Sequence, residues 1–464
     1  MAMLNDWPWH YWAGHAPRRV ALIDGETRWS WPQAARRINQ LADGFARQGV
    51  TPGCGVMLRG RNSAAMLFCY LALLQCGARL LPLNPQLPEA LTDSLPRALD
   101  VAYGLCLDGR PWPSGMIALR FDAAEGDAPA YSVPPWRPRQ LATLTLTSGS
   151  SGLPKAAAHT FAAHLASAEG VLALMGFAAG DSWLLSLPLF HVSGQGIVWR
   201  WLACGATIVV RADRPLDSAL RECTHASLVP TQLWRLLAQN TVPATLKAVL
   251  LGGAMIPQEL TQQAEARGVS CWCGYGLTEL ASTACAKRAD GRPGVGLPLP
   301  GREIRLVDEE VQLRGATLAS GYWRDGRLWP LADDAGWFHT RDRGAFADGE
   351  WRILGRLDNQ FFSGGEGIQP ENIESILLAH PDVRQACVVP VDDAEFGQRP
   401  VAVVEISAST TLDEIRDWLS PQLAGFQRPV AYYPLPGELK NGGIKIARRQ
   451  VKAWVERQAD KKTA

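Results

Sequence analysis

The sequence has almost no net charge, because 46 lysine and arginine residues stand against 45 aspartate and glutamate residues. This balance gives no electrostatic case for nucleic acid or an anionic membrane as the main partner. Cysteine pairs are also lacking. The ten cysteines are scattered singly, and the close pair Cys271 and Cys273 has no second pair at zinc-binding spacing. We therefore expect reduced, mostly buried thiols in a cytoplasmic protein.

A secretory signal and a convincing membrane span are lacking as well. Residues 1–12 contain three tryptophans but no lysine or arginine, unlike the basic start and apolar core of a signal peptide. The uncharged run 62–78 is marginal in length for a span, and a buried helix packed on a sheet explains it better. Polar and flexible residues interrupt the second apolar run, 182–199. We expect no insertion into a membrane.

The chain is long enough, at 464 residues with 47% hydrophobic content, to build more than one core. Short β-branched runs at 206–210 and 247–251 alternate with a helical pattern at 231–239, which predicts layered α/β subdomains with parallel strands. The pattern changes near Gly355, and the remainder predicts a small α+β domain. We expect an N-terminal domain, 1–357, and a C-terminal domain, 358–464. The elements predicted in the second are helices at 371–379 and 412–419 and strands at 386–391 and 401–406.

A loop rich in hydroxyls and glycines follows the apolar alternation of Leu141, Leu144 and Leu146. Glycines allow backbone N–H groups to turn towards an anion and hydroxyls donate further hydrogen bonds, so this pattern is typical of a phosphate cradle. Ala156 stands where the Walker motif has serine or threonine after its lysine, which argues against a P-loop NTPase. The predicted cradle residues are Thr147, Ser148, Gly149, Ser150, Ser151, Gly152 and Lys155.

This loop resembles the signature of the adenylate-forming superfamily, which contains acyl-CoA synthetases, luciferases and the adenylation domains of peptide synthetases. Further motifs of that superfamily follow in the same order: an aromatic-histidine segment, an adenine and metal segment, a ribose-binding aspartate, a hinge and a late lysine. They correspond here to residues 187–194, 274–279, 340–342, 355–358 and 441–445. The resemblance implies an enzyme that uses ATP and Mg²⁺ to activate a carboxylic acid and then transfers the acyl group to coenzyme A.

A carboxylate needs such activation because oxide is a very poor leaving group. Attack of the carboxylate on the α-phosphate of ATP expels pyrophosphate, and a thiolate can then displace AMP. Both steps move negative charge onto phosphate oxygens, so positioned cations and N–H donors should supply most of the catalysis. The resemblance assigns the cation of the first step to Lys445, with His191 and Thr278 as further catalytic residues. Without the resemblance, a solvated surface lysine is an equal alternative for Lys445.

The resemblance places the base and the phosphates of ATP along one segment. Tyr275 would lie against the adenine, with Gly274 and Gly276 as further nucleotide-binding residues, and Thr278 would donate to the α-phosphate. Glu279 would meet the nucleotide through Mg²⁺, an ion that favours few protein ligands plus phosphate oxygens. The alternative for Glu279 is a helix N-terminal charge without a ligand.

The ribose and the hinge are expected further along the chain. Asp342 would accept the ribose hydroxyls, and Arg356 would lie near the ribose or a phosphate. Asp358 matches the hinge residue about which the small domain of the superfamily rotates between the two half-reactions. Arg341 occupies the glycine position of the superfamily's usual Thr-Gly-Asp, which leaves the local backbone open.

The acyl site is expected in the segment that follows Phe190. The resemblance makes His191 an aromatic wall that moves to admit the carboxylate and later the thiol, although a core histidine is the alternative. Arg200 lies in an apolar segment, and a buried arginine needs an anionic or carbonyl partner, either within the protein or on the substrate. Together with Ser193 and Gln195, it favours an aromatic acid with a second carboxylate, the description of o-succinylbenzoate. Position in the superfamily alone adds Ser227, Gly252 and Gly253.

Two other functions stay open on these residues. One is the ligation of a different aryl or acyl acid to coenzyme A. The other is an adenylating protein that loads a carrier without making a CoA thioester. Relatives that activate amino acids usually carry an aspartate in the segment around His191, and Phe190 and Val192 flank it here, which argues against a free amino acid as substrate.

We predict that Lys445→Ala abolishes adenylate formation and spares thioester formation from a supplied acyl-adenylate. The loss of one preorganised cation at a phosphoryl-transfer centre should lower the rate about a hundredfold or more. Pyrophosphate release measured without coenzyme A gives the first rate. A variant that releases pyrophosphate within about threefold of the wild type would remove Lys445 from the mechanism.

Overall fold

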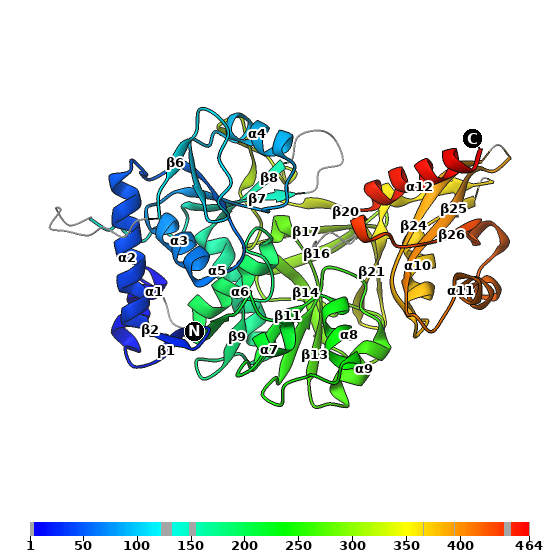
Figure 1. The fold of residues 1–464 in the computed structure, drawn as a ribbon, viewed down its shortest axis with the longest axis horizontal. Coiled ribbons are helices and arrows are strands. Elements are labelled where there is room, and N and C mark those ends of the chain that lie inside the picture. The colour runs from blue at the N-terminus through cyan, green and yellow to red at the C-terminus, as the bar shows by residue number, and fades with distance from the viewer. Residues whose placement is uncertain are drawn as a thin grey trace.

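The molecule is elongated, with its C-terminal elements gathered at one end of the long axis and its first helices at the other (Figure 1). The predicted class, a large α/β part followed by a small C-terminal α+β domain, is confirmed. This computed structural model describes residues 4–121, 132–147, 155–364, 366–393, 395–439 and 447–463.

The largest sheet of the described residues has nine strands, in the order β15-β14-β13-β12-β11-β9-β10-β1-β2. Its central strands are parallel, and antiparallel pairs close both edges. Because the carboxyl ends of parallel strands meet at one edge of a sheet, the residues that follow β11, β12 and β13 gather there. The strands are β1 (Val20–Asp24), β2 (Thr27–Ser30), β9 (Ser182–Leu184), β10 (Thr207–Val210), β11 (His225–Leu228), β12 (Ala248–Leu251), β13 (Ser270–Leu277), β14 (Ser282–Arg288) and β15 (Leu297–Pro298).

A second sheet has eight strands within the described ranges, in the order β19-β18-β8-β7-β4-β3-β5-β6. The antiparallel pair β7 and β8 flanks the predicted phosphate loop. This sheet therefore presents the loop, whereas the first sheet presents the adenine segment. The strands are β3 (Gly55–Arg59), β4 (Arg79–Leu83), β5 (Tyr103–Cys106), β6 (Ile117–Leu119), β7 (Leu141–Thr147), β8 (Lys155–Thr160), β18 (Gly321–Arg324) and β19 (Arg327–Trp329).

Helices fill the space between these two sheets and cover their outer faces. They are α1 (Pro8–His15), α2 (Trp31–Arg47), α3 (Ala64–Gln75), α4 (Glu89–Ala98), α5 (Phe161–Met175), α6 (Val192–Cys204), α7 (Leu216–Ala219), α8 (Pro230–Ala238) and α9 (Gln258–Glu265). The main core joins both sheets through α2, α3, α5 and α6. Separate cores pack α8 and α9 on the nine-stranded sheet and α4 on the eight-stranded sheet. The result is a layered α-β-α-β-α body.

Tryptophans fill much of the central core. Trp7, Trp9, Trp31, Trp199 and Trp201 are each at most 2% exposed, and the rings of Trp31 and Trp201 stack 5.1 Å apart. Aromatic side chains bury large apolar areas and add a geometric preference to their packing. The stack fixes α6 against α2. Helix α6 carries the predicted acyl-site residues, so the core positions that site.

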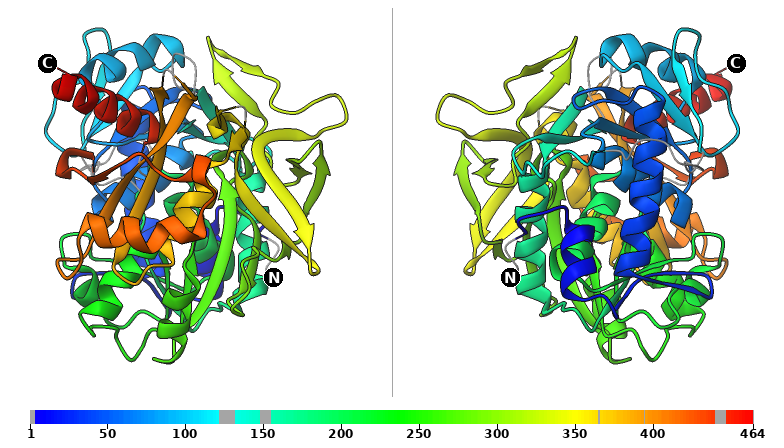
Figure 2. Two further views of the ribbon diagram at one scale, coloured as in Figure 1. Left: turned by 90° about the vertical axis from the view of Figure 1, so that its right-hand side faces the viewer. Right: turned by 90° about the vertical axis from the view of Figure 1, so that its left-hand side faces the viewer.

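The remaining strands form a four-stranded antiparallel sheet and the C-terminal sheet, among the residues described. The first contains β16 (Arg302–Val307), β17 (Glu310–Gly315), β20 (Phe338–Ala347) and β21 (Glu350–Arg356). Its strands project to one side of the molecule in Figure 2. The second contains β22 (Phe361–Ser363), β23 (Glu366–Ile368), β24 (Val383–Asp393), β25 (Gly397–Ile406) and β26 (Ala431–Pro434), packed with α10 (Pro370–Leu378), α11 (Leu412–Leu419) and α12 (Arg448–Thr463).

The elements predicted from the sequence are confirmed. The β-branched runs at 206–210 and 247–251 contain β10 and β12, and the helical pattern at 231–239 is α8. The C-terminal helices match α10 and α11 within one residue, while both C-terminal strands are longer than predicted. The uncharged run 62–78 contains α3, which is buried along almost its whole length. In the described part of the chain, no helix is long and apolar enough to cross a membrane.

The cysteines also follow the expectation. All ten are free, and six of them are buried. Burial raises the pKa of thiols such as Cys204 and Cys223 to about 12, so these side chains stay protonated.

We predict that Gly276→Ala strongly lowers stability, whereas Gly274→Ala is tolerated better. Both glycines lie in β13, but a Cβ at Gly276 would overlap the carbonyl oxygen of Ser282, while the nearest atoms to a Cβ at Gly274 are 3.4 Å away. Overpacking of this kind costs about 1–3 kcal/mol or more. Urea unfolding of both variants measures the difference, and equal destabilisation would contradict the close approach.

Candidate active site

The predicted ribose residues meet the predicted adenine residue between two sheets. Tyr275 of β13 donates its hydroxyl to Oδ2 of Asp342 in β20 at 2.5 Å, and Arg356 of β21 donates from Nη1 to Oδ1 at 3.2 Å. Asp342 is only 9% exposed. Burial, followed by the charge of Asp342, raises the pKa of Tyr275 well above its usual value. Three residues that are distant in the sequence thus form one hydrogen-bonded cluster.

Arg341 resolves the backbone question that the sequence left open. Its φ is +60°, in the left-handed region that favours glycine. Arg341 therefore has a backbone conformation suited to the glycine of Thr-Gly-Asp, although it carries a side chain. The Arg341 N–H donates to Oε1 of Glu310 at 2.9 Å, and its guanidinium pairs with Asp358 at 2.9 Å. Arg341 links the ribose segment to the predicted hinge.

Thr278 and Glu279 lie on the short helix η1 (Thr278–Leu280), directly after β13. The Tyr322 hydroxyl donates to Oε1 of Glu279 at 2.8 Å. Burial raises the pKa of Glu279, an effect that the Tyr322 hydrogen bond partly offsets. A half-buried carboxylate with a raised pKa is a group that a bound cation would stabilise in its charged form.

The donor set around Glu279 fits Mg²⁺ held together with a nucleotide. No group of three or more His, Cys, Asp or Glu side chains that could hold a metal occurs in the described ranges. Mg²⁺ commonly takes one or two carboxylates and completes its shell with phosphate oxygens and water. Glu279 provides one such carboxylate at the edge where the phosphate loop begins.

The described ends of the phosphate loop lie beside this turn. Thr147 ends β7 and donates its hydroxyl to the Lys155 carbonyl at 3.3 Å. The Lys155 ammonium lies over the Tyr322 ring, 5.0 Å from its centre. Tyr322 thus connects the loop lysine to Glu279. The other predicted loop residues (Ser148, Gly149, Ser150, Ser151 and Gly152) and the predicted catalytic Lys445 lie outside the described residues.

The predicted acyl residues lie on or just before α6, in β11 or directly after β12. His191 immediately precedes the helix, and its ring lies 4.6 Å from that of Phe190. Ser193 is half-buried one residue into the helix. Gly252 and Gly253 follow β12, where Gly253 has a φ of +81° that requires glycine. These residues belong to the same strand-end edge as η1.

Arg200 lies two turns further along α6 and is 1% exposed. Its Nη1 donates to Ser227 Oγ at 3.3 Å, and its Nη2 lies 3.5 Å from Thr283 Oγ1. Within the described ranges, no carboxylate pairs with it and its Nε has no partner. Burial, with the nearby charge of Arg302, lowers the pKa of Arg200 to about 9. The alternative of an internal carboxylate partner therefore finds no support.

Gln195 is engaged within the protein. It has no exposed surface, and its Nε2 donates to Thr145 Oγ1 and to the Leu189 carbonyl, both at 3.1 Å. These bonds tie α6 to β7 and to the turn before the helix. In this geometry Gln195 holds the helix in place, and its expected contact with the acyl substrate stays a prediction.

Three residues of the site carried no motif in the sequence. Tyr322 holds Glu279, Thr283 lies against Arg200, and Trp183 places its ring 5.2 Å from the Arg200 guanidinium. Each contacts a residue that is distant in the sequence, so no local pattern could reveal the contact. An apolar alternation in β9 and β14 was the only available signal, and it predicts burial rather than a role.

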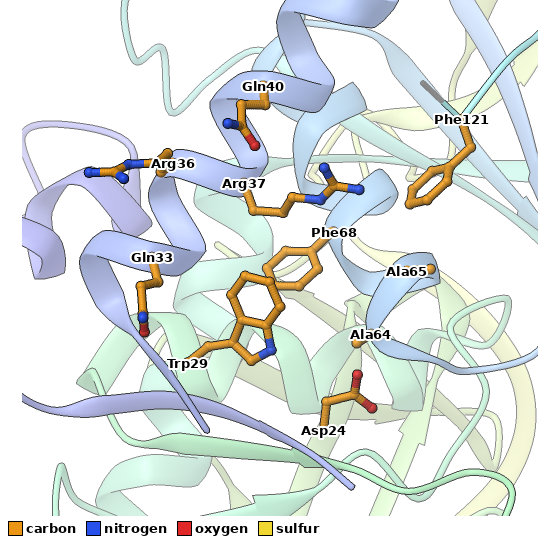
Figure 3. Close-up of a pocket in the computed structure, with 10 residues that line it drawn as sticks. All are labelled: Asp24, Trp29, Gln33, Arg36, Arg37, Gln40, Ala64, Ala65, Phe68 and Phe121. Carbon is orange, nitrogen blue, oxygen red and sulfur yellow. The ribbon is translucent and has the colours of Figure 1, made fainter. Parts of the chain in front are cut away.

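A separate hollow lies on the other side of the molecule, between α2, α3 and the edge of β1 and β2. Figure 3 shows that Trp29, Phe68 and Phe121 line it, with the Arg37 guanidinium among them. None of the predicted site residues lines this hollow. It is therefore distinct from the candidate active site.

The chain belongs to the AMP-binding enzyme family. The model of that family matches residues 9–323, and the model of the AMP-binding enzyme C-terminal domain matches residues 372–445. The two matches cover the two parts of the fold and all the motifs of the candidate site except the ribose and hinge segments between them.

Relatives of known activity match the chain almost from end to end. It is 58% identical to the 2-succinylbenzoate–CoA ligase of Salmonella typhimurium, over 97% of this chain and 98% of that one. It is 54% identical to the 2-succinylbenzoate–CoA ligase of Escherichia coli, over 98% of this chain and 100% of that one. An arginine-to-lysine variant of E. coli MenE with bound OSB-AMS has the same fold, with a TM-score of 0.94 and 53% identity over 99% of this chain and all of that one.

A more distant solved structure is o-succinylbenzoate CoA synthetase (MenE) from Bacillus subtilis in complex with ATP and magnesium ion. It has a TM-score of 0.84 and 25% sequence identity, over 93% of this chain and 96% of that one. The fold is thus shared by chains whose sequences have diverged widely.

We predict that Glu279→Gln raises the Mg²⁺ concentration needed for half-maximal adenylation by about tenfold or more, because the amide keeps the shape but removes the charge that attracts the ion. Tyr322→Phe is the matched control, since it removes only the hydrogen bond to Glu279 and should have a much smaller effect. Pyrophosphate release titrated with Mg²⁺ measures both. An unchanged Mg²⁺ requirement in Glu279→Gln would exclude Glu279 as a ligand.

Proposed function

We propose that this protein joins 2-succinylbenzoate to coenzyme A through an acyl-adenylate, using ATP and releasing AMP and pyrophosphate, as a step of menaquinone biosynthesis in the cytoplasm. Its class is an AMP-forming acid–thiol ligase. Support comes from the end-to-end relatives at 58% and 54% identity, both of them 2-succinylbenzoate–CoA ligases.

The nucleotide would bind at the edge where β13, β20 and β21 meet. Asp342 accepts from Tyr275 and Arg356 in the structure, and a carboxylate is a suitable acceptor for ribose hydroxyls. The phosphates would extend towards Thr278 and Lys155, with Glu279 holding Mg²⁺, which supplies positive charge to the phosphate oxygens when bound. This order places the α-phosphate near the first turn of α6.

The acid would enter beside His191, with its reacting carboxylate directed at that phosphate. Attack forms the carboxylate–phosphorus bond as the bond to pyrophosphate breaks. In the second half-reaction, the thiolate of coenzyme A forms the thioester as AMP leaves. Lys445 would neutralise charge in the first step, and the small domain, with its boundary and hinge proposed at Asp358, would turn between the steps.

The observation that carries the substrate assignment is the unpaired burial of Arg200. A cation removed from water is stabilised only by an opposite charge or by several hydrogen bonds. Arg200 has two hydroxyl neighbours, Ser227 and Thr283, and no carboxylate among the described residues. A second carboxylate on the acid would complete this site, and 2-succinylbenzoate carries one.

The experiment that tests the function is an assay of ATP- and CoA-dependent thioester formation over a panel of aryl and fatty acids. We expect 2-succinylbenzoate to be the preferred acid. Preference for a monocarboxylic acid would establish a CoA ligase of different specificity. Adenylate formation without thioester for every acid would favour a protein that loads a carrier.

We predict that Arg200→Ala raises the KM for 2-succinylbenzoate by roughly thirtyfold or more and leaves the KM for ATP within about threefold. A lost charge-assisted contact of about 2–5 kcal/mol gives this magnitude. Benzoate-type acids that lack the second carboxylate should be nearly insensitive to the change. Equal losses for both classes of acid would assign Arg200 to folding.

Arg211→Ala is the control for the loss of a buried arginine. Arg211 is 4% exposed and is already paired with Glu222 at 2.7 Å. Its removal should lower the melting temperature without changing the preference among acids. A similar change of preference in both variants would show that the effect of Arg200 is indirect.

A further inference from the structure

An ion pair holds the connection between the two parts of the molecule. Strand β21 ends at Arg356 and β22 begins at Phe361, so the short helix η2 (Leu357–Asn359) joins the four-stranded sheet to the C-terminal sheet. Asp358 lies in this joint. Arg341, from the neighbouring strand β20, donates to Asp358 Oδ1 from Nε at 3.2 Å and from Nη2 at 2.9 Å. The N-terminal part of the molecule thus binds the connecting helix η2 (the joint) through the Arg341 side chain.

This ion pair depends on a residue in an unfavourable backbone conformation. Arg341 has a φ of +60°, and a residue with a Cβ in the left-handed region is less stable there than glycine. Its N–H donates to Glu310, which holds the backbone in this state. Strained backbone that persists needs compensation from its surroundings, and it is a reason to look for a role. The contact of the Arg341 side chain is with Asp358.

The same aspartate is connected to the nucleotide site. Oδ2 of Asp358 accepts from Nη2 of Arg356 at 3.2 Å, while Nη1 of Arg356 donates to Asp342 at 3.2 Å. The two arginines hold the pKa of Asp358 below its usual range, although burial acts in the opposite direction. Asp358 therefore stays charged, and one arginine that binds it also binds the predicted ribose carboxylate.

A second contact fixes the same arrangement of the two parts. The guanidinium of Arg384, in β24 of the C-terminal sheet, lies over the ring of Trp234 in α8, 4.1 Å from its centre. Helix α8 packs on the nine-stranded sheet of the N-terminal part. Cation–π contacts of this geometry are attractive. Arg384 is distant in sequence from η2, so the two contacts are independent observations of one orientation.

We propose that Arg341 is a positioning residue that holds the joint at Asp358, so that it stabilises the observed orientation of the C-terminal domain and couples that orientation to the nucleotide site through Arg356. The proposal rests on the proposed function, because two half-reactions at one site give the orientation its consequence. Arg341 does not touch the substrates. It sets the relative populations of two domain orientations, one of which serves the first half-reaction and the other the second.

The proposal predicts how the ratio of the two half-reaction rates changes in two variants. Since Arg341 and Arg384 stabilise the same orientation, removal of either contact should shift the ratio of the two half-reaction rates in the same direction. The expected shift is about three- to tenfold, because Arg341 and Asp358 are partly exposed and such pairs are weak individually. A merely structural residue would change both rates together and leave the ratio unchanged.

The half-reactions are measured separately in Arg341→Ala, Arg341→Gly and Arg384→Ala. Pyrophosphate release without coenzyme A reports adenylation, and thioester formation from supplied acyl-adenylate reports the second step. Arg341→Gly removes the guanidinium and the backbone strain together, so agreement with Arg341→Ala assigns the effect to the ion pair. Arg343→Ala is the matched control, since Arg343 lies on the same strand and pairs at 2.7 Å with Glu309, away from the joint.

Amide hydrogen exchange at residues 357–360 gives a readout that needs no substrate. The expected result is faster exchange in both Arg341 variants and wild-type exchange in Arg343→Ala. The proposal is overturned if the ratio of half-reaction rates stays within about twofold of the wild type in the Arg341 variants, if Arg341→Ala and Arg384→Ala shift it in opposite directions, or if Arg343→Ala shifts it equally. Failure of the proposed acid as a substrate leaves the exchange result intact, so the two proposals fail separately.

Discussion

The arrangement of the acyl site depends on one constraint, the burial of the Arg200 guanidinium without an acidic partner among the described residues. Burial of a cation opposes folding unless something neutralises it, and the described part of the chain supplies the hydroxyls of Ser227 and Thr283 and the face of Trp183. The tryptophan core fixes the helix that carries Arg200, and Gln195 ties that helix to β7. The protein therefore keeps a preorganised positive site.

The predicted nucleotide site is organised around the carboxylate of Asp342. Asp342 is shared by Tyr275 and Arg356, and Arg356 continues to Asp358 in the joint between the two sheets. One network thus reaches from the predicted adenine position to the domain connection.

Much of the fold could be predicted from the sequence, because apolar periodicity is a local signal. The strands at 206–210 and 247–251, the buried helix within 62–78 and the helices α10 and α11 all follow from it. The motifs also indicated which residues would meet, and the structure brings Tyr275, Asp342 and Arg356 together. Functional residues that lie in short motifs can be proposed from the sequence alone.

What the sequence could not provide is contact between distant strands. Tyr322 reaches Glu279 from another sheet, and Arg384 reaches Trp234 from another domain. The left-handed backbone of Arg341 follows from tertiary context, since the residue type alone argues against it. Gln195 was expected at the substrate, but its buried amide bonds within the protein. The functional roles of all the predicted site residues, Lys445 and Ser148 to Gly152 among them, stay predictions from the motifs.

The most direct test of the account is calorimetric binding of a stable acyl-adenylate analogue of 2-succinylbenzoate to the wild-type protein, compared with the same analogue whose distal carboxylate is a methyl ester. If that carboxylate neutralises Arg200, esterification should weaken binding by about 2–5 kcal/mol, or roughly thirtyfold and more. Equal affinity for the two analogues would contradict the account.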